Sequence, residues 1–387
     1  MSSPLRLRGP AELAAVLPYQ LGYHPTRSLV VVAFHGTSMG LVQRIDLPGD
    51  GDEAVAAQAL LRPLLVEQPS AVVLFGYEQA QGQAMPMLDA VAAVCGSAGV
   101  QIRDRLVVRA GRWFAPDCHD ACCPGAGTAL AAPADLPVVA EFVGREIAPL
   151  PDRVALEDVV RLRDAARGQR IAALAETLSR ARVAGDTEGD VEGDVEGDVL
   201  HGQDEIQGSV LVDHRRRRDL LDWREVLRVD HDATPVEQLP EALCARLAVS
   251  LEDVGLRDAL VSWLCPGSMP AGLVEPGLRE QLETALEQPG VRDPVADSVS
   301  LHRAVSLDRA VRLHRTERRL VDLCACLDDD WAVAPLTVLG AFAWWRGDGA
   351  LSRIALEQAL SARPGYRLAL LLEQMVDLAI RPDRCSA

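Results

Sequence analysis

The sequence predicts an α/β N-terminal domain with a mixed sheet, followed by an all-α C-terminal domain that ends in a tetratricopeptide-like helical hairpin. Two observations lead to this fold class. Short β-branched apolar runs alternate with helical periodicity up to Trp113, as in a sheet with crossover helices. From Leu136 onward, the apolar residues recur with helical spacing.

The N-terminal half contains the predicted strands. The runs SLVVVAF, LVQRIDL and AVVLFGY are rich in β-branched and other apolar residues, which is typical of strands. A short turn separates the first two runs, so we expect an antiparallel hairpin, whereas an intervening helix favours parallel pairing. The expected strands are 28–34, 41–47 and 71–77, followed by a strand pair over 102–113 bent at Gly111, and the expected helices are 52–68 and 85–98.

Four segments follow from these patterns. We expect an α/β domain at 1–130 closed by a cysteine-rich loop, connecting helices at 131–185, an acidic low-complexity linker at 186–209 and a helical domain at 210–387. The linker repeats Gly, Asp, Val and Glu, with nine acidic residues and no arginine between Asp186 and Glu205. The ligand spacing of a calcium-binding EF-hand loop is not present there.

Helical periodicity covers most of the chain after the sheet. Several of these segments carry a stripe of apolar residues, as helices packed on a core do. The expected helices are 135–145, 156–183, a helix from the arginine run at 215–218 to about 228, and then 237–249, 252–264, 273–288, 298–327, 335–346, 349–362 and 366–379.

Composition excludes several classes of protein. All 39 basic residues are arginine, and lysine is absent. A Walker A phosphate loop, a Schiff-base enzyme and a protein kinase each need a lysine, so these classes are excluded. The net charge of −17 argues against a nucleic-acid partner, because phosphate contacts need a basic surface.

The lengths of the apolar runs predict whether the protein associates with a membrane and where it is located in the cell. The longest uncharged apolar run, between Asp330 and Arg346, is shorter than the roughly 20 residues of a membrane span, so we expect no membrane association. The first residues, MSSPLRLRGPAELAAVL, lack the long apolar stretch of a secretion signal. We therefore expect a cytoplasmic protein with reduced cysteines.

The densest cluster of candidate metal ligands lies in one loop: Cys118, His119, Cys122 and Cys123. Zinc prefers four cysteine or histidine ligands in a tetrahedron. No second cysteine pair follows at the usual distance, so folding would have to bring a further ligand, such as His24 or Cys95. The alternatives are a reactive thiol pair at Cys122 and Cys123, or a packed turn in which cysteines serve as small apolar residues.

Polar residues flank the ends of the first two predicted strands: His24, Arg27, Ser28, Arg44 and Asp46. Strand ends are where α/β sheets commonly bind ligands, so these residues are the candidate lining of a small-molecule site. In the alternative interpretation, His24 and Pro25 shape a turn, while Arg44 and Asp46 lie on the solvated face of their strand.

The segment from Gly36 to Gly40 matches the G-x-S-x-G pattern of a hydrolase nucleophile elbow. An elbow requires a strand, a turn and then a helix. A second strand follows the turn here, so the pattern predicts a hairpin turn instead.

The C-terminal stretch GDGALSRIALEQALSARPGY is similar to the second helix of a tetratricopeptide repeat. Small residues at Ser352, Ala355 and Ala359 would let two helices approach closely. A single unit is visible, whereas such solenoids need about three. A groove for a partner and a helical hairpin that caps the domain are the two interpretations.

Four segments resemble one known family, in the same order: LPYQLGYHPTRSLVVVAF, RIDLP, the stretch from Arg112-Trp113 to CCPGAG, and the stretch from APLTVLGAF to LLLEQ. This pattern is similar to the domain-of-unknown-function 4192 family of high-GC bacteria. The resemblance implies that the Cys-Cys-Pro segment belongs to the family pattern and that the acidic repeat is an insertion. It carries over no catalytic residue.

Two functional hypotheses remain. The first is a cytoplasmic binding or scaffold protein that contacts a protein partner through its helical half. The alternative is a small-molecule enzyme with a site at the strand ends near His24 and Arg44, braced in one version by zinc.

Overall fold

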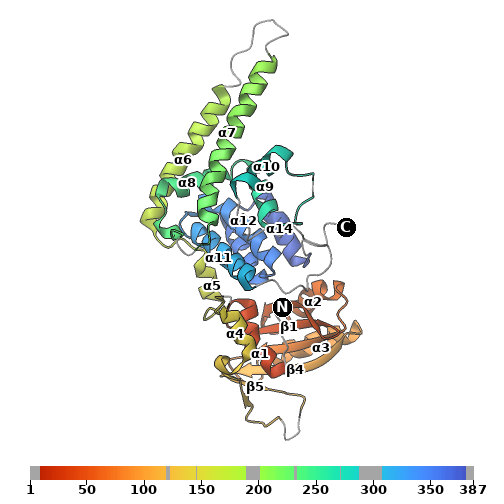
Figure 1. Ribbon diagram of the computed structural model, residues 1–387. Helices are drawn as coiled ribbons and strands as arrows, with labels where there is room; N and C mark the ends of the chain where they lie inside the picture. Colours follow the sequence, from red (N-terminus) through yellow and green to blue (C-terminus); the bar gives the residue numbers. More distant parts are fainter. Residues whose placement is uncertain are drawn as a thin grey trace. The chain divides into compact units, whose positions relative to one another are not determined.

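The computed structural model describes residues 9–118, 123–144, 146–188, 201–230, 233–270, 272–286 and 307–380 (Figure 1). Side chains are described for these residues except 185–188, 201–211 and 307–310. The chain divides into an N-terminal unit, which extends to Leu156 and also includes residues 377–380, and a helical unit from Glu157 to Val376. Each unit is described by itself.

Six strands of the described residues form one sheet in the order β2-β1-β3-β4-β5-β6. β1 pairs antiparallel with both β2 and β3, and β3 pairs parallel with β4, which confirms the predicted mixed sheet. The strands are β1 Ser28–His35, β2 Ser38–Asp46, β3 Ala71–Tyr77, β4 Gln101–Arg109, β5 Arg112–Phe114 and β6 Thr128–Ala129.

Three helices of the N-terminal unit, α1, α2 and α3, pack against this sheet, and α4 packs on α1 (Figure 1). On one face, an added Cβ at Gly76 would lie 2.6 Å from the Cβ of Ala84, just before α3, so glycine permits this close approach. α2 packs beside α3, and on another part of the unit α1 packs with α4 through Val16, Tyr19 and Phe142. The helices are α1 Pro10–Leu21, α2 Glu53–Val66, α3 Met85–Ser97 and α4 Pro137–Gly144.

The turn between β1 and β2 decides the meaning of the G-x-S-x-G pattern. β1 ends at His35 and β2 begins at Ser38, and Gly36 has a φ of +62° that favours glycine. The two strands form an antiparallel hairpin. Ser38 therefore starts a strand and does not occupy a nucleophile elbow.

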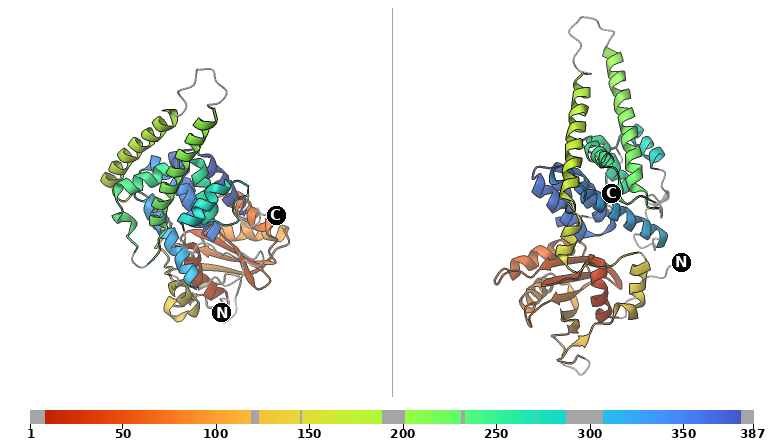
Figure 2. Two further views of the ribbon diagram at one scale, coloured as in Figure 1. Left: turned by 45° about the horizontal axis from the view of Figure 1, so that its top comes forward. Right: turned by 90° about the vertical axis from the view of Figure 1, so that its left-hand side faces the viewer.

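The helical unit and the segment that leads into it are built from helices alone in their described residues (Figure 2). α6 and α7 are the two longest, and the residues between them, 189–200, lie outside the described residues. The helices are α5 Arg153–Val159, α6 Ala165–Glu188, α7 His201–Leu227, α8 Glu241–Ser250, α9 Val254–Leu264, α10 Pro276–Ala285, α11 Leu307–Cys324, α12 Asp329–Arg346, α13 Gly349–Ala362 and α14 Arg367–Asp377.

The expected single helix at 156–183 is wrong, because the structure has a break after Val159. The carboxylate of Asp164 accepts a hydrogen bond from the backbone N–H of Arg167 at 3.0 Å, which caps a new helix start. The backbone N–H of Arg163 donates to the carbonyl oxygen of Ala325 at 3.0 Å instead of continuing a helix. Helix α1, which contains Pro18, is not among the helices expected from the sequence.

The last helices begin with side-chain caps. Asp328 caps α12 by accepting from the backbone N–H of Trp331, so α12 starts before the expected position and contains Pro335. Asp348 caps α13 in the same way through Leu351. α12 and α13 thus form a helical hairpin joined at Gly347, whose φ is +92°.

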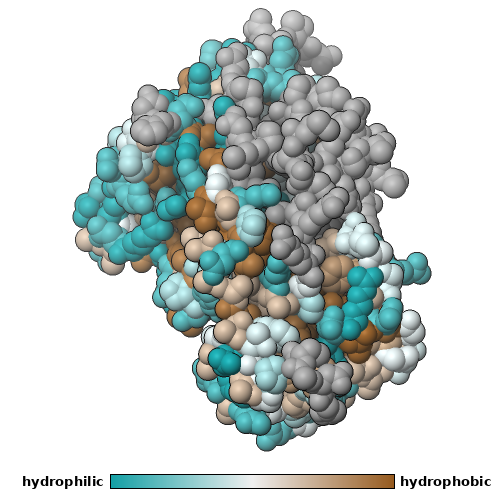
Figure 3. Space-filling view, turned by 60° about the horizontal axis from the view of Figure 1, so that its bottom comes forward, coloured by the Kyte–Doolittle hydropathy of each residue, from teal (hydrophilic) through white to brown (hydrophobic). Residues whose placement is uncertain are grey.

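No helix in the described parts of the chain is long and apolar enough to cross a membrane. On the face visible in Figure 3, apolar residues are interspersed with polar ones. The exposed large apolar side chains of the described residues are spread over several elements, such as Val55 on α2 and Leu371 on α14.

Candidate functional site

The structure brings together three of the five residues predicted at the strand ends. Ser28 begins β1 and pairs in register with Asp46, the last residue of β2. Arg44 lies two residues earlier on β2, so its side chain is on the same face as those of Ser28 and Asp46. These residues lie on one face at one end of the sheet because β1 and β2 are antiparallel neighbours.

His24 and Arg27 do not join this group. Both are exposed, and they lie in the segment that precedes β1. Their backbones hold that segment in place: the N–H of His24 donates to Leu150, and the carbonyl oxygen of Arg27 accepts from Leu47 at 2.9 Å. Arg27 has a φ of 42°, an uncommon value for a residue other than glycine.

Tyr77 is a member of the group that sequence reasoning missed. It ends β3 and pairs in register with Ser28, opposite Asp46 on the other neighbouring strand. The run AVVLFGY indicated a buried strand, but only the order of strands in the sheet places its last residue beside Ser28. We call Ser28, Arg44, Asp46 and Tyr77 the polar corner.

Arg44 is the charged centre of the polar corner. Its side chain is only 8% exposed and forms an ion pair with Asp46. Asp46 also lies 3.6 Å from Nη1 of Arg153, the first residue of α5. The guanidinium carbon of Arg44 lies 5.8 Å from the ring centroid of Tyr23, so a cation–π contact helps to hold it.

Three buried polar atoms of the polar corner have no hydrogen-bond partner within the described part of the chain: Ser28 Oγ, Tyr77 Oη and Arg44 Nε. Ser28 is fully buried and Tyr77 is 6% exposed. Burial raises the pKa of Tyr77, so its hydroxyl keeps its proton near neutral pH. The atoms that face no partner are thus hydroxyl and guanidinium donors.

The residue after Tyr77 has a different role. The carboxylate of Glu78 accepts hydrogen bonds from the backbone N–H groups of Gly82 and Ala84 and pairs with Arg109. Arg109 in turn lies over the ring of Phe114, 4.5 Å from its centroid. Glu78 is therefore satisfied, and it closes the loop that leads from β3 to α3.

The cysteine-rich loop is only partly described. Cys118 and Cys123 are half-buried, whereas His119 and Cys122 lie outside the described residues. Cys95 is fully buried in α3, and burial raises the pKa of its thiol to about 11. Among the residues that are described, no group of three or more histidine, cysteine or acidic side chains could hold a metal ion. The zinc site stays a prediction.

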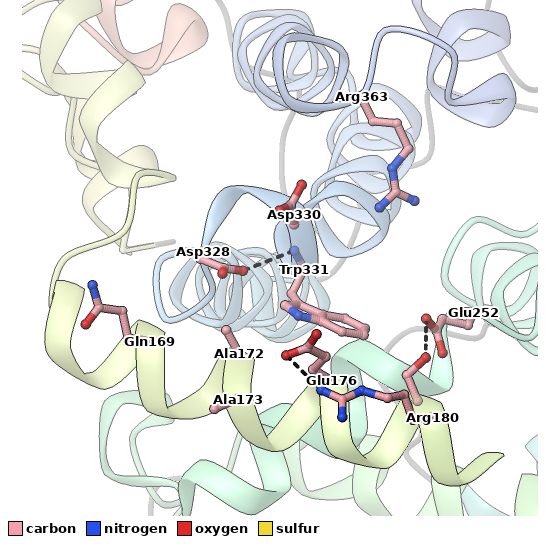
Figure 4. Close-up of a pocket in the computed structure, with 11 residues that line it drawn as sticks. Gln169, Ala172, Ala173, Glu176, Arg180, Glu252, Asp328, Asp330, Trp331 and Arg363 are labelled. Carbon is pink, nitrogen blue, oxygen red and sulfur yellow. Dashed lines mark hydrogen bonds and ion pairs between the residues drawn. The ribbon is translucent and has the colours of Figure 1, made fainter. Parts of the chain in front are cut away.

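The helical unit contains a groove with a volume of about 850 Å³ (Figure 4). One wall is the face of α6 that carries Ala172 and Ala173, whose small side chains leave room above the helix. The other residues come from α6, the end of α8, the start of α12 and the end of α13: Gln169, Glu176, Ser179, Arg180, Glu252, Asp328, Asp330, Trp331 and Arg363.

Trp331 is the aromatic side chain of this groove, and Figure 4 shows it over α6. Two interactions order the wall next to it: Glu176 pairs with Arg180 at 3.2 Å, and Ser179 bonds to Glu252 at 3.0 Å. Both interactions lie along one side of the groove.

Carboxylates outnumber guanidinium groups in the groove. Glu176, Glu252, Asp328 and Asp330 line it together with Arg180 and Arg363. Burial, with the nearby charges of Asp330 and Asp329, raises the pKa of Asp328, while its bond to the N–H of Trp331 opposes that shift. The groove therefore has an excess of negative charge beside an aromatic ring.

The fold defines a two-part protein in which a mixed α/β sheet unit precedes a helical unit. The chain belongs to the family described as Domain of unknown function (DUF4192), which it matches over residues 10–272 and 271–383. This match confirms the family resemblance of the four sequence segments. No curated protein and no solved structure matches the chain.

Proposed function

We propose that the protein binds a partner protein through the groove of its helical unit and takes there a peptide segment that presents basic and apolar side chains together. The observation that carries the proposal is the placement of Trp331 among four carboxylates in a groove of about 850 Å³. Tryptophan is over-represented among the residues that dominate binding energy at protein interfaces.

The hairpin of α12 and α13 supports this function. Its sequence is tetratricopeptide-like, and repeats of that kind build concave surfaces from paired helices. Trp331 lies at the start of α12 and Arg363 directly after α13, so the hairpin supplies both to the groove.

The negative charge of the groove favours a basic peptide as its partner. Arg180 is already paired with Glu176, so the remaining carboxylates outnumber the one remaining guanidinium group, that of Arg363. A peptide with arginine or lysine side chains complements this charge, and an acidic peptide is repelled. Apolar peptide side chains would contact the Trp331 ring and the methyl groups of Ala172 and Ala173.

The cysteines of the helical unit support a cytoplasmic location for this function. Cys244, Cys265 and Cys324 are buried as thiols, and burial raises the pKa of each. Thiols used as small apolar groups are typical of proteins from reducing compartments.

Fluorescence anisotropy with the full-length protein tests the proposal. The probes are two dye-labelled peptides of equal length with the same leucine and tryptophan positions, one with arginine and the other with glutamate at every charged position. We expect the arginine peptide alone to bind, and more weakly as salt increases, because exposed charges are screened.

A pair of neighbouring aspartates provides the matched control. Asp330 lines the groove and Asp329 does not, although both lie in the first turn of α12. We expect Asp330→Asn to weaken binding of the arginine peptide about fivefold, near 1 kcal/mol, and Asp329→Asn to have little effect. Equal binding of both peptides, or equal effects of both variants, would contradict the proposal.

A further inference from the structure

The polar corner of the N-terminal unit contains more unsatisfied polar atoms than a sealed core tolerates. Leaving a buried donor without a partner costs about 1–3 kcal/mol. Ser28 Oγ, Tyr77 Oη and Arg44 Nε are three such donors at neighbouring register positions of one sheet face. Native proteins rarely keep such a group unless water or a ligand satisfies it.

The rest of this face shows that the corner is a local exception. Val30 and Phe75 continue the face inward from Ser28 and Tyr77, and both are fully buried and apolar. Val108 pairs in register with Tyr77 on the next strand and is also buried. An apolar residue at position 28 or 77 would extend this core without leaving an unpaired hydroxyl.

The polar corner also lies at the edge of the sheet where α/β sheets commonly bind ligands. β2 ends at Asp46, β3 at Tyr77 and β4 at Arg109, and the pairing register places these ends at the same edge of the sheet. The carboxyl ends of strands are the common ligand-binding edge of α/β sheets. His24, Thr26 and Arg27 are exposed in the segment that leads into Ser28, so solvent reaches the chain one residue from the corner.

The unpaired atoms are donors, so they suit an anion. Arg44 carries a positive charge, and the hydroxyls of Ser28 and Tyr77 can each donate one hydrogen bond. Asp46 pairs with both Arg44 and Arg153, so Arg44 does not have this carboxylate to itself. Charge-assisted hydrogen bonds from a buried guanidinium group are among the strongest contacts to carboxylate and phosphate.

We propose that the polar corner binds the oxyanion of a small molecule, a carboxylate or a phosphoryl group, between Nε of Arg44 and the hydroxyls of Ser28 and Tyr77. Arg44 supplies the charge, while Asp46 and the ring of Tyr23 hold its guanidinium group in place. Ser28 and Tyr77 supply neutral donors on adjacent strands. This site lies in the N-terminal unit and is independent of the groove in the helical unit.

Thermal unfolding of the full-length protein tests this site with two probes, inorganic phosphate and acetate, each compared with sodium chloride at equal ionic strength. A ligand that binds only the folded state raises the unfolding midpoint, by a few degrees when its concentration is well above Kd. We expect one of the two probes to raise the midpoint of the wild-type protein, and the probe that does so identifies the oxyanion as phosphoryl or carboxylate.

Tyr77→Phe and Ser28→Ala each remove one of the two neutral donors. Each substitution removes only one oxygen atom from the core. We expect each to reduce the probe-dependent shift and the double variant to abolish it, whereas Tyr366→Phe, in the helical unit, keeps the full shift. Phosphate also stabilises proteins generally, and the double variant measures that contribution.

Two results would overturn the proposal. The first is that neither probe raises the wild-type midpoint above that in sodium chloride, in which case ordered water satisfies the three donors. The second is an equal shift in the wild-type protein and the double variant, in which case the anion acts elsewhere. Both variants are expected to fold, because each removes a hydroxyl that has no partner.

Discussion

Ser352 on α13 donates a hydrogen bond from its Oγ to the carbonyl oxygen of Gly340 on α12 at 2.8 Å. Both residues are buried, and a Cβ added at Gly340 would lie 2.9 Å from the side chain of Leu356. The two helices therefore approach closely because Gly340 has no side chain and Ser352 has a short one.

This contact predicts the effect of a single methyl group. Gly340→Ala should destabilise the protein by about 1–3 kcal/mol, since overpacking forces neighbouring side chains or backbone to shift. Gly277→Ala is the control, because Gly277 lies in α10 with nothing within 4 Å of an added Cβ, and alanine favours helix. Urea unfolding measures both, and equal stability of the two variants would refute the packing explanation.

A buried arginine fixes the end of α7. The guanidinium group of Arg319 donates to the carbonyl oxygens of Glu225, Val226 and Thr234. We expect Arg319→Gln to lower the free energy of unfolding by about 3 kcal/mol, because these carbonyl groups lose a charged donor. The neighbouring Arg318 is exposed, so Arg318→Gln should change stability by less than about 0.5 kcal/mol. Calorimetry of the two variants distinguishes a carbonyl clamp from a general effect of charge.

Glu317 predicts how stability depends on pH. Burial raises its pKa to about 7, although its ion pair with Arg346 at 2.6 Å opposes this shift. The folded state therefore holds a proton that the unfolded state has already lost between about pH 4.5 and 7. The contribution of Glu317 to stability is full below pH 4.5 and is lost as pH rises towards 7.

Replacement of Glu317 should flatten this profile. We expect Glu317→Gln to remove most of the loss of stability that this residue causes between pH 4.5 and 7. Denaturant unfolding at a series of pH values measures the slope. A slope that is the same in wild type and Glu317→Gln would show that Glu317 does not titrate in this range.

Thiol labelling separates the buried cysteines from those of the cysteine-rich loop. Cys265 and Cys324 are buried, and burial raises the pKa of both thiols, so we expect them to react only after unfolding. Cys118 and Cys123 are half-buried and should react first in the folded protein. Mass spectrometry of labelled peptides gives the order of reaction. Labelling of the loop that increases after a chelator is added would instead support the predicted zinc site.

The sequence by itself determined the mixed sheet with its leading hairpin and the helical character of the second half. These features depend on local periodicity: strands β1 and β3 are nearly continuous apolar runs, and α13 begins and ends where its composition changes at Gly349 and Ala362. The family could also be recognised, because its segments keep their order along the chain.

Tertiary structure decided which residues meet. Ser28 and Tyr77 are far apart in the sequence, and they became neighbours because β1 inserts between β2 and β3 in the sheet. The break before Asp164 depends on a hydrogen bond to Ala325, a contact that no local pattern contains. The groove around Trp331 likewise joins four separate segments. The periodicity of the sequence identifies the apolar face of each helix or strand. It does not identify the element that this face packs against, because that depends on packing over the whole unit.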